Sequence, residues 1–234
     1  MEKTTKVIRN CFLIDGTGKN PLEGATVIIE GTKIVEVLAG ETKIPQGSET
    51  IDAKGRTVMP GLMDAHVHLA SWTDPTQPNI YVSMMSTGSN LMTLYAAKHA
   101  QEMLDAGFTT VRDLGGYVNM MNHVVLAVRR AIEIGMARGP RILVAGDVSQ
   151  TGGHLDMGLP AFCRRENRIT ADGPWEARKL VREMNRWGHD LIKTSSSGGG
   201  GTTEEFWWNN YTVDELSAIV DETHAVGKKV AVHA

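Results

Sequence analysis

The 234 residues, 41% of them hydrophobic and 22% charged, are enough to bury a substantial core in one or two domains. The net charge of -3 comes from 27 acidic and 24 basic residues, so nothing suggests a nucleic acid or an anionic membrane as partner. No apolar run is long enough for a signal peptide or a membrane span. Cys11 and Cys163 lack a paired-ligand spacing, which favours buried thiols in a reducing compartment, and we expect a cytoplasmic protein.

Residues 1–58 contain short β-like runs separated by Gly, Asn and Pro. The predicted strands cover residues 7–14, 25–30, 33–38 and 49–52. We interpret this segment as a small, sandwich-like N-terminal β domain.

Residues 59–234 repeat a different pattern, in which an apolar strand, a long loop and an amphipathic helix follow one another. The predicted strands cover residues 58–70, 108–114, 141–148, 190–196 and 229–234. Each predicted helix is followed by a glycine suited to a left-handed C-terminal position: Gly107, Gly135, Gly188 and Gly227. This pattern predicts an α/β fold, the first five units of a (β/α)8 TIM-type barrel. The loops that follow strands are the longer ones, which places function at the C-terminal ends of the strands.

The predicted barrel is incomplete, because the strands are spaced by about 43 residues and a closed eight-unit barrel would need roughly another hundred. An open five-stranded piece would leave two strand edges unpaired and inner apolar side chains exposed. We therefore expect this chain to be a fragment.

The most informative motif is a His-x-His pair in the first barrel strand. Residues i and i+2 of a strand face the same way, so Asp64, His66 and His68 share one face. Two imidazoles on one face can bind a divalent ion such as Zn²⁺. The alternative is that both histidines only form hydrogen bonds at the end of the strand.

Lys193 lies near the end of the fourth barrel strand, between apolar neighbours where an ordinary ammonium group has little reason to be. It either pairs with a carboxylate or works as a neutral amine, which is favoured beside metal ions. A neutral amine can take up CO₂ and become a carbamate that bridges two metals. His233 is predicted to face inward with Ala231 at the end of the fifth strand.

Several segments in order resemble the amidohydrolase superfamily, and most closely its prolidase-like and imidazolonepropionase-like branch of metal-dependent hydrolases. The matching segments are DGTG, IDAKGRTVMPGLMDAHVHL, AGFTTVRDLGG, GPRILVAG, TGGH, LIKTSSSGG, YTVDEL and VAVHA. The resemblance extends over nearly the whole chain, and it implies that the N-terminal β domain is incomplete here, because the family usually finishes this domain with C-terminal strands. It implies a distorted β/α barrel with two divalent metal ions, for which we expect Zn²⁺. His66 and His68 would bind one ion and His233 the other, with carbamylated Lys193 between them.

The resemblance also implies a histidine from the sixth strand and a metal-binding general base, an aspartate, from the eighth. Neither position lies within this sequence, so we expect the chain as given to be inactive alone.

Two further residues resemble family positions that contact substrate. His154, in TGGH, would reach toward the substrate carbonyl, and the alternative is a solvent-exposed loop histidine. Tyr211 would hold substrate or the oxyanion. Thr212 and Glu215 also form a predicted capping box, which makes Tyr211 the residue able to pack on Leu216 as a hydrophobic staple.

Other residues have open interpretations. Asp113 either orients a metal ligand or pairs with Arg112 or another basic group. Phe206, Trp207 and Trp208 line an apolar substrate pocket, pack locally or form an oligomer contact, and we expect a homo-oligomer. The remaining histidines have no ligand spacing and are predicted to lie at the surface: His99, His123, His189 and His224.

The leading hypothesis is a hydrolase in which a metal-bridged hydroxide cleaves an amide-type C–N bond of a dipeptide or an N-acyl amino acid. Lys193 motivates it, because single-metal deaminases of the superfamily generally lack a bridging lysine. A cyclic amidohydrolase or imidazolone ring hydrolase is the alternative enzyme. A non-catalytic fragment or assembly module is the alternative outside enzymes, because three barrel strands are missing.

Overall fold

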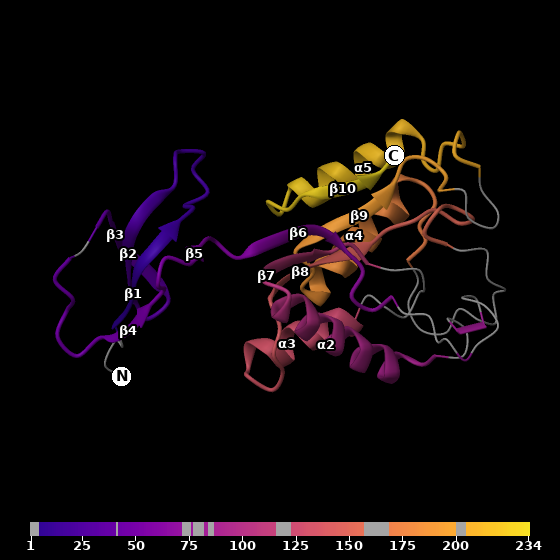
Figure 1. Cartoon of the computed structure of the whole chain (residues 1–234). Helices are drawn as coiled ribbons and strands as arrows, with labels where there is room; N and C mark the ends of the chain where they lie inside the picture. The colour runs from indigo at the N-terminus through magenta and orange to yellow at the C-terminus, as the bar shows by residue number, and fades with distance from the viewer. Residues whose placement is uncertain are drawn as a thin grey trace. The chain divides into compact units, whose positions relative to one another are not determined.

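The computed structural model of the chain describes residues 5–40, 42–71, 76, 82–83, 87–115, 123–156, 169–199 and 205–234. Cys163 lies outside these described residues. The chain divides into two compact units, Met1–Gly61 and Leu62–Ala234 (Figure 1), so the boundary lies three residues beyond the predicted one. None of the described helices is both long enough and apolar enough to span a membrane.

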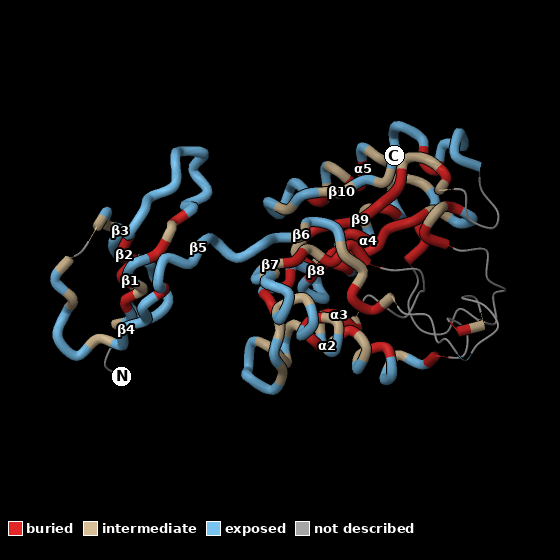
Figure 2. Tube along the Cα trace, viewed as in Figure 1, coloured by how far each residue is buried: buried red, intermediate tan, exposed pale blue. Residues whose placement is uncertain are grey.

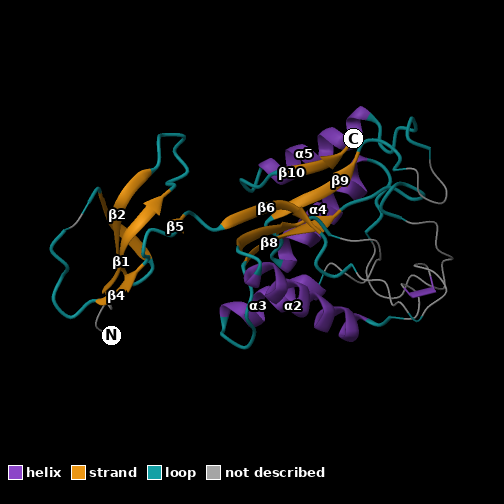
Figure 3. Cartoon of the chain, in the orientation of Figure 1, coloured by secondary structure: helices purple, strands orange, loops and turns teal. Residues whose placement is uncertain are grey.

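The N-terminal unit is a mixed sheet of five strands (Figure 3). In chain order these are β1 (Thr5–Leu13), β2 (Leu22–Glu30), β3 (Lys33–Leu38), β4 (Glu49–Asp52) and β5 (Thr57–Val58). The first three are antiparallel neighbours, and β4 and β5 both run parallel to β1. The described residues of this unit form one sheet, so a second layer of a sandwich is not among them.

Alternate residues of β1 and β2 build the core of this sheet. Cys11, Leu13, Ala25 and Val27 are buried together with Ala53. The Cys11 thiol is free and donates a hydrogen bond of 3.2 Å to the Ala25 carbonyl, which confirms the prediction of a buried thiol.

The second unit contains five parallel strands in the order β10-β9-β8-β7-β6. They are β6 (Leu62–Val67), β7 (Phe108–Asp113), β8 (Arg141–Asp147), β9 (Leu191–Ser195) and β10 (Val230–His233). All five strands were predicted from sequence. Together with the helices they form a curled half-barrel, so the predicted partial TIM barrel is confirmed.

Four described helices alternate with these strands and cover one face of the sheet (Figure 1). They are α2 (Ser89–Asp105), α3 (Val124–Glu133), α4 (Pro174–Trp187) and α5 (Val213–His224). The glycines predicted to follow them have positive φ angles: Gly107 (97°), Gly135 (76°), Gly188 (90°) and Gly227 (73°). Each helix therefore ends where its glycine allows a left-handed turn.

Burial in the barrel sheet is concentrated in the strands β8 and β9 (Figure 2). On the helix-covered face, Val111, Ile142 and Val144 pack with α2 and α3, and Ile192 packs with α4 and α5. The inner face has a smaller cluster made of Leu114, Ala145, Leu191 and Ala231. Leu143, which shares the inner face with Ala145, is 39% exposed because the sheet does not close over it.

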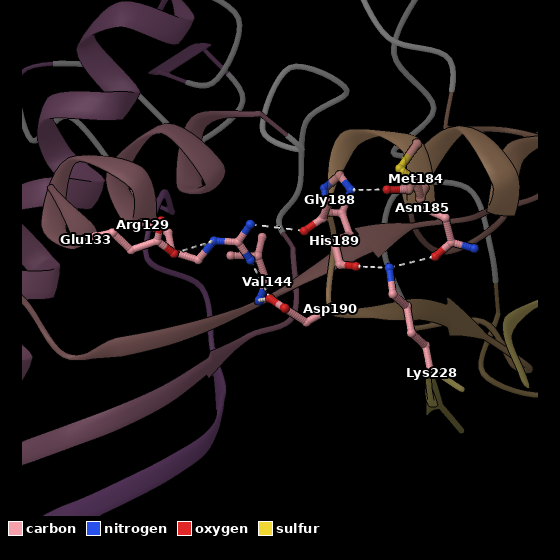
Figure 4. A network of polar contacts seen from close by, with 9 residues as sticks. All are labelled: Arg129, Glu133, Val144, Met184, Asn185, Gly188, His189, Asp190 and Lys228. Carbon is pink, nitrogen blue, oxygen red and sulfur yellow. Dashed lines mark hydrogen bonds and ion pairs between the residues drawn. The ribbon is translucent and has the colours of Figure 1, made fainter. Parts of the chain in front are cut away.

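A polar network joins α3, the end of α4, β8 and the segment before β10 (Figure 4). Arg129 donates to the Asp190 carboxylate at 2.6 Å, and Asp190 also accepts the Val144 amide at 2.8 Å. The Lys228 amine bonds to Asn185 and to the His189 carbonyl. These contacts lie before strands β9 and β10 begin, at the end opposite to the predicted site.

The prediction of four surface histidines is wrong for three of them. His189 is 1% exposed, because it follows α4 into the network and its Nδ1 bonds to the Met184 carbonyl at 3.0 Å. His99 and His123 are half-buried, and the His99 Nδ1 lies 2.8 Å from the Leu69 carbonyl. Only His224 is exposed among the four.

Candidate active site

A cavity of about 250 Å³ lies at the C-terminal ends of the barrel strands. Five residues predicted from the sequence line it together with Leu114, Leu155 and Gly199: His66, His68, His154, Lys193 and His233. They come from β6 and the residue that follows it, from β9, from β10 and from the loop after β8, so residues far apart in the chain meet at one place.

His66 and His68 both line the cavity, as predicted, whereas Asp64 lies opposite Val111 of the helix-covered face because the strand is irregular after Asp64. Their ring centroids are 5.1 Å apart and the rings are tilted by 73°. His68 Nδ1 lies 2.7 Å from the Gly115 carbonyl, so it carries the proton and donates it. This bond leaves Nε2 as the lone-pair nitrogen that a metal ion requires.

Asp113 fixes the segment to which His68 is bonded. Its two carboxylate oxygens accept the Leu69 amide at 2.7 Å and the Gly115 amide at 3.0 Å. Burial raises the pKa of Asp113 to about 7, against the lowering effect of these two bonds. The sequence favoured an ion pair for Asp113, but its observed contacts are with the backbone at Leu69 and Gly115, which agrees with the alternative of an orienting role.

Lys193 is 4% exposed and faces the inner side of the sheet. Across the ladder it lies between Asp147 of β8 and Ala231 of β10. Burial lowers the pKa of Lys193, Asp147 raises it and Arg112 lowers it, and the net effect is a decrease that favours the neutral amine. The pKa of His66 is also lowered, mainly by burial and then by the charge of Lys193.

His154 and His233 are stacked, with ring centroids 4.1 Å apart and an interplanar angle of 23°. The loop carrying His154 is tied to Asp172, which accepts the Thr151 amide at 2.9 Å and the Thr151 hydroxyl at 2.7 Å. Gly199 lies so close to the His154 ring that an added Cβ would meet it at 1.9 Å. His154 is therefore half-buried in the cavity rather than free in solvent.

The structure does not bring Tyr211 into the cavity. Tyr211 is buried in the core beneath α4 and α5, where Leu216 packs against the same cluster, and its hydroxyl donates to the Ala171 carbonyl at 3.3 Å. The capping box of Thr212 and Glu215 is present. The hydrophobic-staple interpretation fits this placement, whereas a role in substrate or oxyanion binding gains no support from it.

Sequence reasoning missed Asp147, which lies next to the site. Asp147 is 1% exposed and lies beside Lys193, and an added Cβ on Gly115 would meet its carboxylate at 2.0 Å. The signal was present, because Asp147 has the same strand parity as Leu143 and Ala145.

Phe206, Trp207 and Trp208 are exposed and are not among the residues that line the cavity. The predicted role in a substrate pocket therefore gains no support from the structure, and the oligomer contact stays a prediction.

The donor set fits metal binding only if Lys193 contributes. Within the described ranges, no group of three or more His, Cys, Asp and Glu side chains is arranged to hold an ion. His66, a His68 whose tautomer is fixed by Gly115, His233 from β10 and a buried amine with a lowered pKa do meet in one cavity. A carbamate on that amine would add the missing oxygen ligands.

Comparison with known proteins agrees with this geometry. Ochratoxinase from Aspergillus niger is 30% identical over 99% of this chain and 50% of its own length. The crystal structure of a Xaa-Pro dipeptidase with bound methionine superposes with a TM-score of 0.86 at 30% identity, over 99% of this chain and 57% of the other. Imidazolonepropionase from Staphylococcus aureus is 31% identical over 51% of this chain and 30% of its own length.

The chain thus spans about half the length of the relatives it matches. The profile of the Amidohydrolase family matches residues 57–234, which include the whole second unit and every residue that lines the cavity. The half-barrel and the inward-facing histidines agree with this match, and the chain belongs to the amidohydrolase family.

Proposed function

We propose that the whole protein is a binuclear metal-dependent hydrolase that cleaves the amide bond of a dipeptide or an N-acyl amino acid. The observation that carries this proposal is Lys193, a buried amine in the same cavity as His66, His68 and His233. A lysine at this place has a use in a two-metal site as a carbamate, whereas a single-metal site would not need it.

In this proposal His66 and His68 hold one ion, His233 the other, and carbamylated Lys193 lies between them. Nitrogen ligands with a carboxylate-like bridge suit Zn²⁺. The ions would supply Lewis-acid activation of water and of the scissile carbonyl. His154 is held against His233 at the cavity wall, where its ring can donate a hydrogen bond to the substrate carbonyl oxygen.

The similarity to a Xaa-Pro dipeptidase supports a dipeptide as substrate. The similarity to imidazolonepropionase favours a second candidate, the opening of a cyclic amide, but it extends over a smaller part of the chain. Mass spectrometry of the products separates the two, because ring opening adds water to one molecule and dipeptide cleavage yields two.

The proposal is tested by metal analysis and activity of the whole protein on a panel of dipeptides and N-acyl amino acids. We expect two ions per chain and a carbamate signal in ¹³C NMR after growth with labelled bicarbonate. Lys193→Met should lower activity more than about a hundredfold, because loss of a ligand exceeds the effect typical of an outer partner. Lys179→Met, at an exposed lysine, is the control.

One tightly bound ion per chain, with Lys193→Met as active as the control, would reject the binuclear site. A non-catalytic role would instead be favoured by a metal-loaded whole protein that hydrolyses no member of the panel.

A further inference from the structure

The strand that carries the two histidines is irregular at His66. In the β6–β7 ladder Asp64 is opposite Val111 and Val67 is opposite Asp113. Two residues of β6 therefore face the single residue Arg112 of β7, which is a β-bulge. Such a bulge changes the direction of a side chain and leaves a peptide group outside the ladder.

Side chains satisfy both polar groups of the peptide that joins Ala65 to His66. The Arg112 Nε donates to the Ala65 carbonyl at 2.7 Å. The His66 amide donates to Asp64 Oδ1 at 2.9 Å. The Arg112 guanidinium and the Asp64 carboxylate thus hold the two polar groups of one peptide unit. This peptide lies where the hydrogen-bonding pattern between the strands is interrupted.

This arrangement matters for His66 because the peptide group before it is held by these two side chains, whereas the His68 ring is fixed by its bond to the Gly115 carbonyl. Rotation of the Ala65–His66 peptide would turn the His66 Cα–Cβ bond and move its ring relative to that of His68. The mutual placement of the two rings, 5.1 Å apart, depends on that peptide.

We propose that Asp64 and Arg112 are positioning residues, a peptide clamp that aims the His66 imidazole at a metal ion. The inference rests on the proposed function of the cavity. It is distinct from a simple charge effect, because a guanidinium near the site repels a cation. If charge alone mattered, removing the guanidinium would strengthen metal binding, whereas loss of the clamp weakens it.

Two matched pairs of variants of the whole protein separate the clamp from charge. Arg112→Gln puts an N–H donor where Nε was, and Arg112→Met puts a methyl group there, and both are neutral. Asp64→Asn keeps an acceptor oxygen for the His66 amide, and Asp64→Ala removes it, while both lose the same charge. Arg138→Met, at an exposed arginine far along the chain, is the control for a lost surface cation.

The readouts are the Zn²⁺ dissociation constant, the visible spectrum with Co²⁺, and hydrogen exchange of the His66 amide in metal-free protein. Arg112→Met and Asp64→Ala should weaken Zn²⁺ binding about 10- to 100-fold, the range of outer-shell partners. Each should differ from its polar counterpart, Arg112→Gln or Asp64→Asn. The His66 amide should exchange faster in Asp64→Ala than in Asp64→Asn. The melting temperature of the metal-free variants shows that each is folded.

Equal or tighter Zn²⁺ binding in Arg112→Met than in Arg112→Gln would overturn the clamp. If the unaltered protein binds no Zn²⁺, the proposed function fails, and the clamp is judged by hydrogen exchange alone. Equal exchange rates of the His66 amide in Asp64→Ala and Asp64→Asn would then overturn it as well.

Discussion

At the scale of single residues, Asp113 links the stability of the half-barrel to pH. Its pKa rises from 3.8 to about 7 on folding, so the native state holds the proton more tightly than the unfolded chain does. The stabilisation of the folded state by protonated Asp113, on the order of 4 kcal/mol, is therefore complete below about pH 4. It is lost as the pH rises through about 7.

We predict that the free energy of unfolding of metal-free protein falls more steeply between pH 4 and pH 7 than that of Asp113→Asn, which has no titrating carboxyl. Urea unfolding at each pH measures it. The histidines contribute to both proteins, so the difference isolates Asp113. Parallel pH profiles would contradict the prediction.

Gly199 sets the position of His154. An added Cβ would lie 1.9 Å from the His154 ring, so Gly199→Ala must displace the ring from its stack on His233. We predict that imidazole NMR signals of both histidines shift and that kcat/KM of the whole protein falls by up to about a hundredfold. Gly88→Ala, where an added Cβ meets nothing within 4 Å, is the control. Unchanged His154 and His233 signals would contradict the prediction, because the loop at residue 199 would then have moved instead of the His154 ring.

The period of two in a strand was sufficient to predict that His66, His68, Lys193 and His233 face one cavity. It was insufficient for Arg112, whose contact with Ala65 depends on a bulge that no local residue signals. Tyr211 shows the opposite case. The sequence predicted two roles for Tyr211, contact with substrate and packing on Leu216 as a hydrophobic staple. Its place in the buried core cluster supports the packing role.

At the scale of elements, the capping box of α5 also stabilises its neighbour. The Thr212 hydroxyl oxygen accepts a hydrogen bond from the Glu215 amide. Glu215 Oε1 accepts a hydrogen bond of 2.7 Å from the amide of Gly173, the residue before α4. Two helix N-termini therefore depend on one side-chain pair.

We predict that Thr212→Ala lowers the free energy of unfolding by about 1 kcal/mol and the melting temperature by about 2–4 °C. Zn²⁺ affinity should not change, because α5 begins away from the residues that line the cavity. Ser217→Ala, at an exposed position within the same helix, should be neutral or slightly stabilising. Equal stability of the Thr212 and Ser217 variants would contradict the role of the cap.

The elements themselves were largely predictable, because glycines after helices and apolar strand runs are local signals. The two-residue strand β5 was missed, since its pairing with β1 is a contact between distant residues. His189 was misplaced for a similar reason. It follows a helix in sequence, but the network around Asp190 and Lys228 buries it.

At the scale of the whole molecule, the strand count was predicted from spacing, and the half-barrel follows from it. The inner face carries Leu143 exposed beside the buried cluster of Ala145 and Leu191, at the side where the sheet remains open. The cavity lies at the C-terminal ends of these strands, and β6 with the residue that follows it, β9, β10 and the loop after β8 supply its histidines and lysine.

The central claim is that His66, His68, His233 and a modified Lys193 bind metal ions in this cavity. The most direct test is a crystal structure of the zinc-loaded whole protein with anomalous data recorded at the zinc edge. We predict two anomalous peaks, one about 2.0–2.1 Å from the imidazole nitrogens of His66 and His68 and one at the same distance from that of His233, with carbamate density on Lys193 between them. Peaks away from these side chains, or an unmodified Lys193 amine with no metal beside it, would contradict this assignment.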